Sequence, residues 1–137
     1  MTDPFTSLIE EFSKKRKIKS RVTVRYDPKR RVPGRLNTQY NKKTGEIVKQ
    51  EIIFNPRHFE ELEKFNKRDT ENYRRYTVAH EMGHVEQLEE WGAKRTAQTP
   101  TFILEDDADK RAYIMSGLDQ HTVRVSIKNL EERIKRK

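Results

Sequence analysis

Two histidines four residues apart, with a glutamate directly after the first, constrain the fold of this chain more than any other feature. The segment reads His80-Glu81-Met82-Gly83-His84. Four residues are about one helical turn, so a helix places both imidazoles on one face, where both can bind a single Zn²⁺ ion. Glu81 points about 100° away and is too offset to be a ligand. It can instead accept a proton from a water at the metal, the general-base role in a zinc peptidase.

An acidic segment farther along the chain can complete such a site. It reads Glu105-Asp106-Asp107-Ala108-Asp109. Catalytic zinc has three protein ligands and one open position, so two histidines need a third partner. We predict Glu105 as this ligand and Asp109, one turn later, as the acceptor of a hydrogen bond from the non-ligating nitrogen of His80. The alternative is that the acidic residues only offset the positive end of a helix dipole.

The two motifs together carry a family resemblance. His80-Glu81-x-x-His84 followed by Glu105-x-x-x-Asp109 resembles the gluzincin metallopeptidases, whose third zinc ligand is a glutamate. The short chain, in which no apolar run reaches the length of a membrane helix, is similar to the minimal soluble gluzincins, or minigluzincins. Regulatory peptidases of the ImmA/IrrE type are a second resemblance, although their downstream Phe-Ala and Met-Pro signatures are absent.

This resemblance covers about residues 46–117. It implies a zinc endopeptidase that cleaves peptides or unfolded proteins, or, in the ImmA/IrrE alternative, a regulatory peptidase with one dedicated substrate. Small gluzincins are associated with latency, so a basic terminal segment of this chain could block the acidic rim of the cleft. The resemblance also implies that the strand before the helix of His80 and His84, here called the zinc helix, lines the cleft and pairs with an extended substrate. Alternatively, that strand is internal and paired on both sides.

Apolar periodicity and turn residues predict an α+β fold in one domain spanning residues 1–137. We expect a small twisted sheet of about three strands, with the helix that carries the histidines and the helix that carries Glu105 packed behind it. The predicted helices cover 4–16, 56–65, 69–91 and 120–136, and the predicted strands cover 21–26, 36–40 and 46–54. Asp69 or Thr70 is the expected cap of the zinc helix, and 93–100 the expected loop after it.

Hydrolysis of a peptide bond also needs a donor that stabilises the oxyanion. His121 is the preferred candidate because it follows the Glu105 helix shortly, with Tyr113 and Arg124 as further candidates. A histidine near the start of a helix is also common as a surface or capping group. His58, on a short helix before the zinc helix, is expected to be structural.

Composition limits the remaining possibilities. The chain has no cysteine, which excludes disulfides, a cysteine nucleophile and thiolate ligands. We expect a cytoplasmic, soluble protein, since no segment resembles a membrane helix or signal peptide. Abundant charged residues are typical of thermophile proteins. The net charge of +8 comes largely from clusters at 14–17, 29–31 and 133–137. These clusters favour a solvated surface, and a basic nucleic-acid-binding protein with a non-catalytic metal site remains the alternative of a different class.

Overall fold

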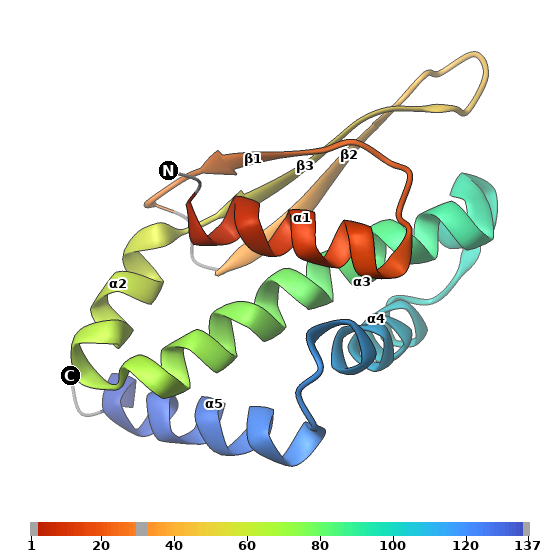
Figure 1. The fold of residues 1–137 in the computed structure, drawn as a ribbon. Coiled ribbons are helices and arrows are strands. Elements are labelled where there is room, and N and C mark those ends of the chain that lie inside the picture. Colours follow the sequence, from red (N-terminus) through yellow and green to blue (C-terminus); the bar gives the residue numbers. More distant parts are fainter. Residues whose placement is uncertain (1–2, 30–32, 136–137) are drawn as a thin grey trace.

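A computed structural model describes residues 3–29 and 33–135, which form five helices and one three-stranded mixed sheet (Figure 1). In chain order the elements are α1 (Pro4–Arg16), β1 (Val22–Tyr26), β2 (Gly34–Tyr40), β3 (Ile47–Phe54), α2 (Pro56–Phe65), α3 (Lys67–Gln98), α4 (Thr101–Ser116) and α5 (Gln120–Lys135). The predicted α+β fold is therefore confirmed, and most predicted bounds agree within a few residues.

The first two helices begin where their local sequence directs. The carboxylate of Asp3 accepts a hydrogen bond from the backbone N–H of Thr6 at 3.0 Å, and Pro4 occupies the first turn of α1. At the start of α2, Asn55 has the same capping role and Pro56 the same position. Both segments join a side-chain cap to a proline whose missing N–H costs nothing at that position.

The sheet has the strand order β1-β3-β2. β1 pairs with β3 in parallel, and β2 pairs with β3 antiparallel through the predicted turn at 41–45. β3 is thus the central strand, and the expectation that it offers a free edge to substrate is wrong. Among the described residues no strand pairs with the outer side of β2, while the parallel pairing with β1 occupies the other side of β3.

Helix α3 is the central element of the molecule. It contacts every other helix as well as β2 and β3, and Figure 1 shows it running between the sheet and α5. Val78, Ala79, Met82 and Val85 of α3 pack into the main core. The other core residues come from α1, β3, α2 and α4: Phe5, Ile9, Phe12, Ile52, Phe54, Phe59, Ala112 and Met115. The face of α3 that carries the two histidines is half-buried and lies beside this core.

Two local predictions about α3 are wrong. The N-cap is Asn66, whose side chain accepts a hydrogen bond from the backbone N–H of Asp69 at 3.0 Å. Asp69 is instead buried and accepts hydrogen bonds from Ser126 and Asn129 of α5, which fixes α5 against the start of α3. The segment expected as a loop is helical to Gln98, because it contains no further helix-breaking residue until Pro100.

The helical segment of α3 changes direction at Gly92, where φ is 80° and ψ is 163°. A residue without a Cβ adopts this conformation at little steric cost. On α5, Val123 and Leu130 are buried as predicted, whereas the side chain of Ile134 lies outside the described residues. None of the described helices combines the length and the apolar character that a membrane crossing requires.

Candidate metal centre

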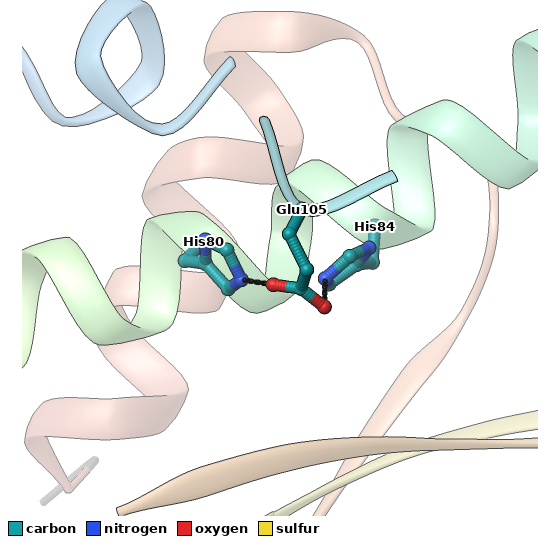
Figure 2. Close-up of side chains that lie close together, drawn as sticks. All are labelled: His80, His84 and Glu105. Atoms are coloured by element: carbon teal, nitrogen blue, oxygen red, sulfur yellow. Dashed lines mark hydrogen bonds and ion pairs between the residues drawn. The ribbon is translucent and has the colours of Figure 1, made fainter. Parts of the chain in front are cut away.

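The three predicted metal ligands converge in the structure. His80 and His84 are half-buried on consecutive turns of α3, and Glu105 projects toward them from the first half of α4 (Figure 2). Nε2 of His80 lies 2.8 Å from one Glu105 oxygen, and Nε2 of His84 lies 3.3 Å from the other. One potential ligand atom from each residue lies within 4.8 Å of the other two.

This donor set fits a divalent metal ion. Two imidazole nitrogens and one carboxylate oxygen are the ligand set of several catalytic zinc centres, which keep a further position open. Both histidines turn the same nitrogen, Nε2, toward the carboxylate, so the three donors face one point rather than separate partners. No other group of three potential ligands of this kind converges among the described residues.

Asp109 lies where the sequence predicts, one turn after Glu105. Its carboxylate is 2.8 Å from Nδ1 of His80, the nitrogen that faces away from Glu105. The hydroxyl of Tyr76 donates a hydrogen bond to the same carboxylate oxygen. The ring of Tyr113 stacks on that of Tyr76, with 5.6 Å between the ring centroids. Burial, together with the nearby Asp109 charge, raises the pKa of Tyr76, so this phenol remains a hydrogen-bond donor at neutral pH.

Glu81 is buried beside the two histidines but does not belong to the ligand group. Burial raises the pKa of its carboxyl, and the neighbouring His80 and His84 oppose that rise. The backbone N–H of Leu36 in β2 also donates to this carboxylate and opposes the rise. A carboxylate with a raised pKa is a better proton acceptor near neutral pH than an exposed one.

A cleft of about 530 Å³ opens between β2 and α3 at the two histidines. Its lining combines the predicted site with the outer strand of the sheet and the start of α4: Gly34, Arg35, Leu36, Thr38, Tyr40, His80, Glu81, His84, Gln87, Leu88, Thr96, Leu104 and Glu105. A neighbouring hollow shares His80 and Glu81 and adds Tyr73, Tyr76 and Thr77. Glu81 therefore lines both hollows, beside the outer strand β2.

Other predicted residues lie away from this cleft. His121 is exposed on the first turn of α5 and, like Arg124, is not among the residues that line the cleft. The structure therefore does not bring His121 to the ligands, and its catalytic role stays a prediction. Tyr113 is not among the residues that line the cleft and contacts Tyr76, on which its ring stacks. His58 lies on α2 against Phe59 and Tyr73.

Neither terminal helix lies in the cleft. The described residues of α1 and α5 are absent from its lining, whereas residues 1–2 and 136–137 lie outside the described residues, so blocking of the cleft by a terminus stays a prediction. Part of the predicted basic surface has structural partners. The ammonium group of Lys15 donates to the backbone carbonyls of Ile114 and Met115 at the end of α4, and Arg16 pairs with Glu86. The basic residues 30–31 and 136–137 lie outside the described residues.

Tyr76 and Gln87 are not among the predicted site residues. Both contact a candidate ligand histidine at helical spacing: Tyr76 lies four residues before His80, and Gln87 lies three residues after His84. Such spacing could have suggested the contacts. No comparable spacing points to Asp107 and Arg111, which reach this region from α4.

Comparison with known proteins gives no match to a protein-family model, to a curated protein or to a solved structure. The gluzincin resemblance therefore rests on the two motifs and their convergence in space.

Proposed function

We propose that this protein is a zinc-dependent peptidase. The observation that carries the proposal is the convergence of His80, His84 and Glu105 on one point, with the buried Glu81 beside them in a cleft. A structural metal site has no need of an additional carboxylate that stays outside the ligand set. A hydrolytic site does need one, because the attacking water must lose a proton.

Each residue has a distinct role in this proposal. His80, His84 and Glu105 would hold the ion, and Asp109 would orient His80 through its Nδ1–H group. A zinc ion bound there would supply Lewis-acid polarisation of the scissile carbonyl and activation of the attacking water. Glu81 would take the proton from that water and deliver it to the leaving amine. Its raised pKa suits both transfers near neutral pH.

The open edge of β2 supports an extended peptide as substrate. The N–H of Leu36 points away from β3, since it donates to Glu81. In an antiparallel ladder alternate residues turn their backbone groups to the same side, so Thr38 faces the same edge. A peptide strand added along this edge would pass over the candidate ligands through backbone hydrogen bonds, a mode that tolerates many sequences. Peptides and unfolded proteins fit this requirement better than folded ones.

The first test is the zinc content of each chain after purification without added metal. We expect about one zinc per native chain, sharply less in Glu105→Ala, and native content in Asp106→Ala. Asp106 is the matched control because it lies on the same turn of α4 but pairs outward with Lys110. Absence of zinc from the native protein, even after reconstitution at neutral pH, would refute the metal centre.

The second test separates catalysis from metal binding. Glu81→Gln should retain zinc but lose hydrolysis of an unfolded protein substrate by about 100-fold or more, because the amide cannot accept the proton. Glu71→Gln, at an exposed position of the same helix, should keep native turnover. Full hydrolysis by Glu81→Gln would contradict the base. If only one protein substrate is cleaved, the regulatory-peptidase alternative gains support over a general endopeptidase.

A further inference from the structure

The two histidines of the candidate centre are held by different kinds of partner. Nδ1 of His80 faces the carboxylate of Asp109, which can only accept a hydrogen bond. Nδ1 of His84 faces the side-chain oxygen of Gln87 at 3.3 Å. A carboxylate can only accept from the ring, whereas an amide can either accept through its oxygen or donate through its NH₂ group, depending on which end faces the ring. What orients the Gln87 amide therefore decides which nitrogen of His84 carries the proton.

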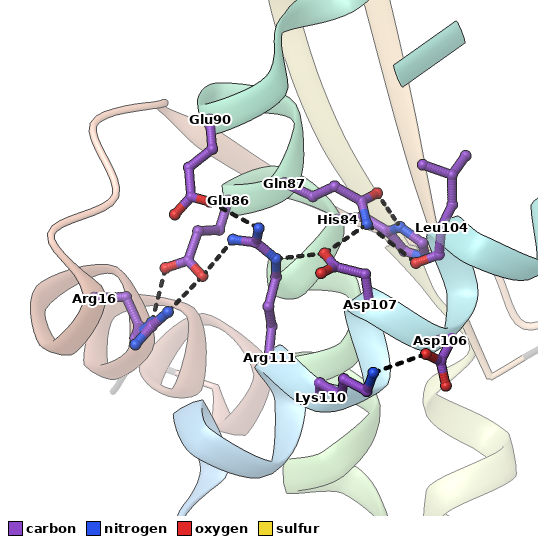
Figure 3. Close-up of polar contacts among 10 residues, drawn as sticks. All are labelled: Arg16, His84, Glu86, Gln87, Glu90, Leu104, Asp106, Asp107, Lys110 and Arg111. Carbon is purple, nitrogen blue, oxygen red and sulfur yellow. Dashed lines mark hydrogen bonds and ion pairs between the residues drawn. The ribbon is translucent and has the colours of Figure 1, made fainter. Parts of the chain in front are cut away.

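Two acceptors on α4 orient this amide. The NH₂ group of Gln87 donates to the backbone carbonyl of Leu104 at 3.1 Å and to the carboxylate of Asp107 at 2.9 Å (Figure 3). Neither partner can donate a hydrogen bond when Asp107 is ionised. Reversing the amide would place its oxygen against two acceptors in a site where Gln87 is 1% exposed. The amide oxygen must therefore face His84.

Asp107 is itself held in place by charged groups. Nε of Arg111 donates to the Asp107 oxygen that also accepts from Gln87, at 2.6 Å. The same guanidinium binds Glu86 at 2.8 Å and Glu90 at 2.7 Å, so it spans from α4 to two turns of α3. Arg16 of α1 binds Glu86 through two nitrogens, each at 2.8 Å. Figure 3 shows this chain of contacts from α1 to His84.

We propose that Gln87, oriented by Asp107 and Arg111, is a positioning residue that fixes the proton of His84 on Nδ1 and turns its unprotonated Nε2 toward Glu105. A histidine must present an unprotonated nitrogen to a metal, and its other N–H commonly donates to a group that fixes the ring. The inference concerns a ligand of the proposed zinc centre, and its effect on metal affinity rests on that proposal. In the metal-free chain the Glu105 carboxylate lies 3.3 Å from Nε2 of His84 and competes for the same proton, so the Glu105→Ala chain reports the preference that Gln87 alone imposes.

Nuclear magnetic resonance of ¹⁵N-labelled histidines in the metal-free Glu105→Ala protein tests the proposal directly, because this chain lacks the competing acceptor at Nε2. At about pH 9, above the ordinary imidazole range, each ring carries one proton whose position the two nitrogen shifts report. We expect His84 to be protonated on Nδ1 in this chain and to lose this preference when Gln87→Met is added, since methionine keeps the side-chain length but not the hydrogen bonds. Gln98→Met, at an exposed site of α3, is the matched control and should leave the His84 signals unchanged.

A double variant distinguishes positioning from packing. In Gln87→Glu combined with Asp107→Asn, the new carboxylate still accepts from His84 and now also accepts from the new amide, whose oxygen can accept from Arg111. The backbone carbonyl of Leu104 is the one partner that loses its donor. The proton of His84 should therefore return to Nδ1 although both members of the pair have changed. A packing role alone predicts no such recovery, and loss of the Nδ1 proton in this variant to the same extent as in Gln87→Met would overturn the proposal.

Zinc affinity, measured by competition with a chelator, supplies the second readout. Loss of a hydrogen bond to a ligand histidine typically weakens metal binding by about 10–100-fold, which we expect for Gln87→Met. Unchanged protonation and unchanged affinity in a folded Gln87→Met protein would overturn the inference. If Gln87→Met does not fold, the double variant and Asp107→Asn alone decide it. If the native chain binds no zinc but the His84 proton of the Glu105→Ala chain still depends on Gln87, the metal centre is refuted and the positioning role stands.

Discussion

Replacement of Gly83 by alanine tests how α3 and α4 are held at the distance that the candidate centre requires. A Cβ built at Gly83 would lie 2.9 Å from the backbone carbonyl oxygen of Ala108 and 3.4 Å from Cβ of Arg111. Because the nearest atom belongs to the backbone, α4 must shift to make room. Alanine in a helix interior is favoured over glycine by about 1 kcal/mol, whereas overpacking costs about 1–3 kcal/mol. We therefore expect a net loss of up to about 2 kcal/mol for Gly83→Ala.

Urea unfolding of the metal-free protein measures this loss, and the pair Glu71→Gly and Glu71→Ala supplies the helix-propensity term at an exposed site of the same helix. The shift should also weaken zinc binding, because α4 carries Glu105 toward the histidines. If Gly83→Ala gains as much stability as the Glu71 pair predicts and binds zinc like the native chain, this contact does not set the separation of α3 and α4. The reasoning from the close approach would then be wrong.

Three further predictions address individual side chains. Asp109→Asn should weaken zinc binding by about 10–100-fold in a chelator competition, and native affinity would show that His80 needs no such partner. Burial lowers the pKa of His58 below its ordinary value of 6.5, so the unfolded chain binds the proton more readily and stability should decrease as pH falls below about 6.5. Urea unfolding at pH 7.5 and 5.5 should therefore show a smaller decrease for His58→Leu, and equal decreases would contradict this. If His121 stabilises the oxyanion as the sequence suggested, His121→Ala should lower turnover with unchanged zinc content, and native turnover would remove that role.

Short-range patterns predicted most of the fold. The capping residues and prolines at Asp3 and Asn55 fixed the starts of α1 and α2, because the information for a helix start lies within a few residues. The start of α3 was predicted at Asp69 or Thr70 because either residue type can cap a helix. Asp69 instead has a tertiary role, as an acceptor for two side chains of α5, and no local pattern distinguishes this role from capping.

The same limit applies to the candidate site. The convergence of the three candidate ligands could be predicted because four-residue spacing fixes the relative placement of His80 and His84 on any helix, and a catalytic zinc site would need a third donor. Asp109 followed from its spacing to Glu105. The roles of Asp107 and Arg111 could not be predicted, because they depend on how α4 is rotated and shifted against α3. An arginine with acidic neighbours in sequence is usually a solvated surface group, whereas Arg111 binds three carboxylates at the helix contact.

The order of the strands also changes the interpretation of the cleft. Alternation along a strand indicates which residues share a face, but it does not identify the neighbouring strands. Burial of the consecutive residues Ile52, Ile53 and Phe54 is typical of a strand covered on both faces. β2 alternates instead, with half-buried Leu36 and Thr38 between exposed residues. The N–H of Leu36 already reaches Glu81, so the strand that would bind a peptide also restrains the candidate base. A substrate that pairs with β2 would therefore act on the proton acceptor directly, a coupling that an edge on β3 would not provide.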